Sequence, residues 1–139
     1  MSRILLLWVS PQEPNRWIQA KVEQVCSWCE ELPRAVLEYP FGEETAVYKI
    51  GGKVFAMAEM DTEPSFVTLK VLPEEGEILR SQHDFVREGY DTNKRHWITV
   101  DLIPAVPMTG VRELVQDSYH LVVATLPRAK QAGLGLATQ

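Results

Sequence analysis

The residues that could support catalysis are few, and their spacing argues against a catalytic site. Asp117, Ser118 and His120 could form a nucleophile set, but successive positions on a helix point about 100° apart and cannot align as a triad. The three histidines, which include His83 and His96, are too scattered to predict a metal site. The sequence also lacks a glycine-rich phosphate loop, a His-Glu-x-x-His helix and a Gly-x-Ser-x-Gly elbow. We therefore expect no enzymatic activity, no cofactor and no bound metal.

Two cysteines form a Cys-Ser-Trp-Cys sequence at residues 26–29, a spacing found in redox motifs. A redox pair normally follows a strand at the start of a helix, where the helix dipole lowers the thiol pKa. Here the pair falls near the end of a helix predicted over residues 16–32. The apolar stripe of this helix is Ile18, Val22, Val25, Cys29 and Leu32. We therefore interpret the cysteines as small buried hydrophobic residues.

One stretch, from residue 80 to residue 97, departs from the acidity of the chain. The 139 residues include 14 Lys plus Arg against 19 Asp plus Glu, a net charge of −5, which argues against nucleic-acid binding through bulk charge. Within the stretch, Lys94-Arg95-His96-Trp97 places three potential phosphate contacts beside an aromatic that could stack on a base or sugar. The alternative is that Trp97 belongs to the core and the cations solvate a strand end. The other cations of the stretch are Arg80 and Arg87.

Length and composition predict one globular domain over residues 1–139, with its core at about residues 16–127. The apolar run at residues 4–9 is too short for a membrane helix of about 20 residues or for a signal peptide. We expect it to form an N-terminal strand or docking segment, and we expect a cytoplasmic protein. Segments 1–15 and 128–139 should be peripheral, and the Gly/Ala-rich tail should be frayed.

The clearest local pattern is a β-hairpin. Strand-like runs at residues 45–50 and 53–60 are joined by Gly51-Gly52, a two-residue turn of the primed type. The simplest register pairs Tyr48 with Phe55 on a bulky face that could pack against a helix. The opposite face is shallow because its residues are small: Val47, Val54, Ala56 and Ala58, with Lys49 at its rim.

The remaining pattern predicts two more strands and two more helices. The strands are expected at residues 66–71 and 95–102, and residues 85–94 are expected to form a loop. One helix begins at Pro73 and ends near His83, and the last carries apolar residues at helical spacing from Val111 to Val122. The order helix, three strands, helix, strand, helix predicts an α+β domain with one antiparallel sheet covered by helices.

A series of short segments also follows a recognisable order along the chain. The segments are Tyr39-Pro40-Phe41-Gly42, Lys49–Ala56, Val67–Lys70, Leu79-Arg80, Gly89-Tyr90, Asn93–Trp97, Ser118-Tyr119, Leu121–Val123 and Leu126-Pro127. Over about residues 17–128 the sequence resembles the MmcQ/YjbR family of small bacterial proteins. The resemblance implies an α+β fold similar to secretion chaperones and frataxin-like domains. It also implies a DNA-binding role, the label usually given to the family on structural analogy.

The resemblance and the charge pattern together suggest two sets of site residues. The first set would contact nucleic acid: Lys49, Lys53, Lys70, Arg80, Lys94, Arg95, His96 and Trp97. The second set marks motif or ligand-pocket positions: Phe41, Gly42, Gly51, Gly52, Tyr90, Asn93, Ser118 and Tyr119.

Three functions are left open, and we rank them in order. The first is a DNA-binding module with weak, salt-sensitive affinity. The second is a protein-interaction adaptor of secretion-chaperone-like fold, which would use the shallow hairpin face as a partly exposed apolar patch. The third is a small-ligand pocket or enzyme site built from Tyr90, Asn93, His96 and Tyr119. We expect a monomer with no membrane partner.

Overall fold

The computed structural model describes residues 13–90 and 92–136 and has the α+β architecture that the sequence predicts. The N-terminal run at residues 4–9 lies outside this range. The elements are α2 (Glu13–Glu31), β1 (Val36–Glu38), β2 (Thr45–Ile50), β3 (Lys53–Glu59), β4 (Phe66–Lys70), α3 (Pro73–Gln82), β5 (Val86–Glu88), β6 (Trp97–Asp101), α4 (Met108–Thr125) and α5 (Arg128–Gly133). Among the described helices, none combines the length and apolar character needed to cross a membrane.

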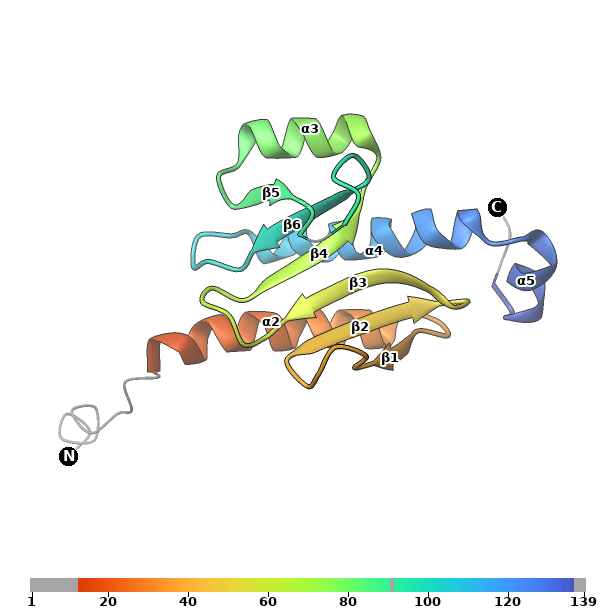
Figure 1. Ribbon diagram of the computed structural model, residues 1–139, viewed down its shortest axis with the longest axis horizontal. Helices are drawn as coiled ribbons and strands as arrows, with labels where there is room; N and C mark the ends of the chain where they lie inside the picture. Colours follow the sequence, from red (N-terminus) through yellow and green to blue (C-terminus); the bar gives the residue numbers. More distant parts are fainter. Residues whose placement is uncertain (1–12, 91, 137–139) are drawn as a thin grey trace.

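The strands form one antiparallel sheet in the order β1-β2-β3-β4-β6-β5. In Figure 1, α2 and α4 both lie behind the sheet. Each contacts β2, β3 and β4, so both helices cover the same face of the sheet. Helix α3 packs beside β5 and β6 at the far edge. The opposite face carries no helix among the described elements, and we call it the uncovered face.

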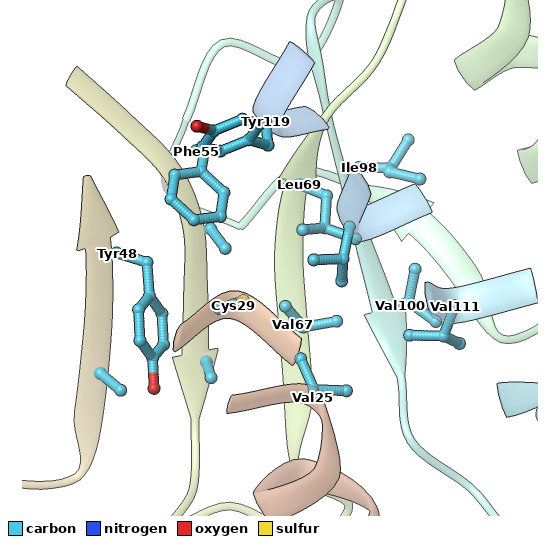
Figure 2. Packing of buried hydrophobic residues seen from close by; sticks show 14 of the residues in the cluster. Val25, Cys29, Tyr48, Phe55, Val67, Leu69, Ile98, Val100, Val111 and Tyr119 are labelled. Atoms are coloured by element: carbon cyan, nitrogen blue, oxygen red, sulfur yellow. The ribbon is translucent and has the colours of Figure 1, made fainter. Parts of the chain in front are cut away.

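The core lies between the sheet and helices α2 and α4 (Figure 2). Val22, Val25 and Cys29 of α2 are fully buried, which confirms the predicted stripe at these positions; the side chain of Ile18 lies outside the described part. Burial raises the pKa of the Cys29 thiol, and to a lesser extent that of Cys26, so both stay protonated. The cysteines are therefore packing residues rather than reactive thiolates.

The Gly51-Gly52 hairpin is present and Ile50 pairs with Lys53 as predicted, but the register farther from the turn is wrong because β3 contains a β-bulge. Both glycines have positive φ, 60° and 84°, as a primed turn requires. Beyond the turn the register shifts by one residue, so that Tyr48 pairs with Ala56 rather than with Phe55. A bulge adds one residue to one strand and reverses the facing of everything beyond it. Phe55 and Ala56 consequently both point into the core.

The bulge also removes the shallow apolar face that the adaptor interpretation requires. Ala56 and Ala58 have no exposed surface and belong to the core beneath the helices, and Val47 is also buried. Val54 alone keeps partial exposure. An exposed apolar patch therefore does not exist at these four residues.

Two edge strands and the last helix were not predicted. Strands β1 and β5 have three residues each, too few to show the alternation that identifies a strand. The tail, predicted to be frayed, forms α5 instead. Its Gln131 side chain donates a hydrogen bond to the carbonyl of Leu126 at 2.9 Å, and Leu134 packs against the core.

Candidate functional site: a cationic cleft beside an aromatic groove

The loop that follows β5 turns back over the uncovered face and positions Tyr90. The backbone N–H of Gly89 donates to the carbonyl of Trp97 at 3.0 Å, and that of Tyr90 donates to the Thr99 hydroxyl at 2.8 Å. The approach is so close that a Cβ at Gly89 would lie 2.6 Å from the Cβ of Trp97. Only glycine fits such a contact, so the Gly89-Tyr90 pair fixes where the tyrosine ring stands.

A cleft on one side of Tyr90 gathers cations from three elements, and we call it the cationic cleft. Arg80 comes from α3, Arg87 from β5 and Lys94 from the loop before β6, and Glu88 and Gly89 complete the lining with Tyr90. Arg80 Nη1 is buried and has no hydrogen-bond partner among the described residues. Lys94 Nζ donates to the Gly89 carbonyl at 3.4 Å. Two of the predicted phosphate contacts, Arg80 and Lys94, are thus brought together.

Arg87, which was not among the predicted site residues, is held in place by two contacts. Its Nε and Nη2 reach the carboxylate of Asp101 at 3.1 Å each, and its guanidinium lies 4.9 Å from the centre of the Phe66 ring. The ion pair with Asp101 offsets part of the Arg87 charge and fixes the orientation of the planar guanidinium. The sequence analysis counted Arg87 among the cations of residues 80–97. It was not chosen as a site residue because strand β5, which carries it, was not recognised.

On the other side of Tyr90 lies a second depression, which we call the aromatic groove. It is lined by Phe41, Thr45, Met57, Glu59, Phe66, Thr68 and Tyr90. Phe41 is 72% exposed and Tyr90 56% exposed, whereas the ring of Phe66 is buried and meets the Tyr90 ring edge-on at 5.4 Å. The Thr45 hydroxyl donates to Glu59 Oε1 at 2.8 Å. Tyr90 therefore borders both the cationic cleft and the aromatic groove.

The other predicted cations do not line the cationic cleft. Lys49 forms an ion pair with Glu38 at 2.9 Å, and Lys53 donates to the Thr125 hydroxyl of α4 at 3.4 Å. Lys70 lies at the end of β4, where it pairs with Trp97 of β6. Asn93, Arg95 and His96 are solvent-exposed in the loop before β6, as is Lys94.

Ser118 is a structural residue and not part of a pocket. Its hydroxyl is fully buried, donates to the carbonyl of Phe55 at 2.6 Å and accepts the N–H of Lys70 at 2.8 Å. These two backbone groups lie one residue beyond the last pair of β3 with β4, Ala56 with Leu69. The hydroxyl therefore bridges the two strands just past the point where their pairing ends.

Tyr119 likewise lies on the helical side of the sheet. Its hydroxyl donates to the carbonyl of Pro33 at 2.6 Å and its ring packs edge-on against Phe55 (Figure 2). Tyr90 borders the opposite face of the sheet, and the Asn93 side chain accepts the N–H of Arg95 at 2.9 Å. The four residues suggested for a small-ligand pocket therefore do not converge.

The glycines of the second predicted set lie in connections between strands. Gly42 follows Phe41 in the connection before β2, and Gly51 and Gly52 form only the hairpin turn.

The geometry defines an α+β protein whose single antiparallel sheet is covered by helices on one face and carries a cationic and aromatic site on the other. The chain belongs to the YjbR family: the family model YjbR matches residues 30–121. It is 36% identical over 101 residues to the uncharacterized protein YbdF of Escherichia coli O157:H7, covering 73% of this chain and 83% of that protein. The uncharacterized protein YjbR of Escherichia coli K12 is 33% identical over 111 residues, with 79% and 93% covered.

Solved structures share the fold. Deinococcus radiodurans protein DR2400, a DUF419 domain, superimposes with a TM-score of 0.78 at 38% sequence identity, covering 84% of this chain and 88% of that one. A protein from Pseudomonas syringae gives a TM-score of 0.62 at 23% identity over 71% and 96% of the two chains, a likeness of fold alone. The resemblance inferred from the sequence motifs is therefore confirmed at the level of family and fold.

Proposed function

We propose that this protein binds single-stranded nucleic acid, DNA in the first instance, with a phosphate in the cationic cleft and a neighbouring base in the aromatic groove. The observation that carries the proposal is the position of Tyr90, whose side chain borders both sites. A nucleotide unit presents a negatively charged phosphate beside a flat base, which matches a cationic cleft beside an aromatic groove. The three cations of the cleft come from three different elements, so they lie together only in the folded chain.

The cleft has the chemistry of a phosphate site. Guanidinium groups bind phosphate through paired N–H donors, and Arg80 and Arg87 both line the cleft. The buried Nη1 of Arg80 lacks an acceptor among the described residues. A buried donor left without an acceptor costs about 1–3 kcal/mol. A phosphate oxygen would recover part of this cost once the guanidinium turns Nη1 from the α3 backbone near Gly76 toward the cleft.

The groove has the chemistry of a base-stacking site. A contiguous group of exposed apolar side chains marks an interaction surface, and exposed rings are the platforms on which proteins stack unpaired bases. Within the groove lining, Phe41 and Tyr90 are the exposed rings, and Met57 and Phe66 add further apolar lining. A paired base is stacked between its neighbours and cannot enter, so the proposal specifies a single strand.

The expected affinity is weak and depends on salt. The chain carries a net charge of −5, and only the local cations oppose it. Binding with few phosphate contacts corresponds to a Kd of about 10⁻⁴ to 10⁻⁶ M, and three contacts to a single strand give a log–log salt slope of about −2. A change from about 50 to about 200 mM salt should therefore weaken binding roughly 10- to 20-fold.

Fluorescence anisotropy with a labelled single-stranded DNA of about ten nucleotides tests the proposal. The double variant Arg80→Ala, Lys94→Ala should bind at least about tenfold more weakly with a shallower salt slope. The matched control is Arg112→Ala, which removes an exposed cation from α4. Tyr90→Ala should weaken binding by about 1–3 kcal/mol through lost stacking.

Binding that does not respond to salt, or that the double variant and Arg112→Ala lower equally, would contradict the proposal. A duplex of the same sequence should bind more weakly than the single strand. We further propose a cytoplasmic monomer, for which light scattering in solution should give a single mass close to 15.8 kDa.

A further inference from the structure

We propose that Glu59 makes the aromatic groove selective for guanine. This inference rests on the proposed function, because it assigns the base that the groove accepts. It starts from an acidic side chain in a site otherwise suited to a polyanion. Glu59 lines the groove together with the exposed rings of Phe41 and Tyr90.

The carboxylate of Glu59 is held by the sheet and by one hydroxyl. Glu59 is the last residue of β3 and pairs with Thr45 of β2 on one side and Phe66 of β4 on the other. The Thr45 hydroxyl donates to Oε1 at 2.8 Å. No described side chain donates to Oε2, and Oε1 keeps a second lone pair, so the carboxylate retains acceptor capacity toward the groove.

An ionised carboxylate accepts hydrogen bonds and donates none, so it distinguishes bases by their donors. Guanine presents its ring N1–H and its amino group side by side, and a carboxylate can accept both with its two oxygens. Adenine and cytosine present one amino group next to a ring nitrogen that carries a lone pair, which the carboxylate repels. Thymine presents one N–H between two carbonyl groups. The groove should therefore prefer guanine, followed by adenine and cytosine, with thymine last.

The negative charge of Glu59 also sets the direction in which a nucleotide lies. Phosphate is repelled from the aromatic groove and attracted by Arg80 and Lys94 in the cationic cleft. The base is then left on the Glu59 side of Tyr90. The same acidic residue that lowers the overall affinity for a polyanion thus adds orientation and base preference.

Anisotropy titrations with five oligothymidines of about ten nucleotides, differing only in one central base, test the inference. The central base is guanine, hypoxanthine (the base of inosine), adenine, cytosine or thymine. Inosine lacks the guanine amino group and is otherwise identical, so it should bind about tenfold more weakly than guanine. In Glu59→Gln the guanine-to-inosine ratio should fall to within about twofold of unity, because the amide replaces one acceptor with a donor.

Two controls keep the outcomes distinct. Gln at position 59 can still accept the Thr45 hydroxyl, so the variant should melt at the wild-type temperature. Glu88→Gln neutralises a carboxylate of the cationic cleft instead and should tighten binding of all five strands without changing their order. Equal affinity for all five strands, or a guanine preference that persists in Glu59→Gln, would overturn the inference while leaving the proposed function intact. No binding to any strand at low salt would overturn both.

Discussion

Replacing Ser118 with alanine should destabilise the fold strongly, although it removes a single oxygen atom. The hydroxyl stands between the carbonyl of Phe55 at 2.6 Å and the N–H of Lys70 at 2.8 Å. Because these groups lie just beyond the end of the β3–β4 pairing and both bond the Ser118 hydroxyl, the alanine variant leaves both without this partner in the interior. We therefore expect a ligand-independent role for Ser118 in joining α4 to the sheet.

The size of the effect follows from the two bonds. A buried backbone group that loses its partner costs about 1–3 kcal/mol. The combined cost of the two lost bonds is reduced because the structure can partly close the space left by the oxygen. Alanine also has a better helix propensity than serine, by about 0.5 kcal/mol. The free energy of unfolding of Ser118→Ala should therefore fall by about 2–4 kcal/mol, out of a total of about 5–15 kcal/mol for a domain.

Equilibrium unfolding in urea measures this change directly. At an unchanged m value of about 1–3 kcal/mol per M, the midpoint should fall by about 1–2 M. Ser81→Ala is the matched control, because Ser81 is exposed on α3 and donates only to the Ile78 carbonyl of its own helix at 2.8 Å. It should change stability by less than about 0.5 kcal/mol. If both serine variants change stability by the same small amount, the bridging role of Ser118 is refuted.

Three further predictions concern stability. Tyr119→Phe leaves the carbonyl of Pro33 without its 2.6 Å donor and should lower the unfolding free energy by about 1–2 kcal/mol in a urea titration; an unchanged midpoint would contradict this. Gly89→Ala places a methyl group 2.6 Å from the Trp97 Cβ and should cost about 1–3 kcal/mol, measured as a lower melting temperature, with Gly133→Ala, where a Cβ meets no atom within 4 Å, as the control. Burial raises the pKa of Cys29, so the folded thiol stays protonated while the unfolded one ionises above about pH 8.5. Stability should therefore fall as the pH rises past that value, and less steeply in a Cys29→Ala variant; equal alkaline slopes would count against the assignment.

Patterns that depend on neighbouring residues were predictable from the sequence. The Gly51-Gly52 pair sets a primed turn regardless of its surroundings, since only residues that tolerate positive φ fit it. The stripe of Val22, Val25 and Cys29 predicted which face of α2 would be buried, because helical spacing alone places them together. The pattern of helices and strands predicted an α+β fold with one antiparallel sheet, and the order of the motifs separately indicated the family.

Features that depend on distant residues were not predictable. The bulge at Phe55 leaves no local pattern, because its stabilising partner, Ser118, is 63 positions away. A register without the bulge assigns Ala56 to the wrong face of the sheet. The exposed patch of the adaptor interpretation depended on that assignment. Strand β5 is too short to recognise alone and exists because β6 pairs with it.

The candidate site shows the same division. Local charge marked Arg80 and Lys94 as potential phosphate contacts, and the family resemblance marked Tyr90 as a motif position, without indicating which of the predicted cations share a surface. Tertiary structure decided that Arg80 and Lys94 meet Arg87 at one cleft, whereas Lys49 pairs with Glu38. Side-chain chemistry is a property of each residue and can be read along the chain. Proximity arises only when strands and helices pack. The sequence by itself therefore determined the family, the longer helices and strands and the available chemistry, and the tertiary structure decided which of these groups can act together.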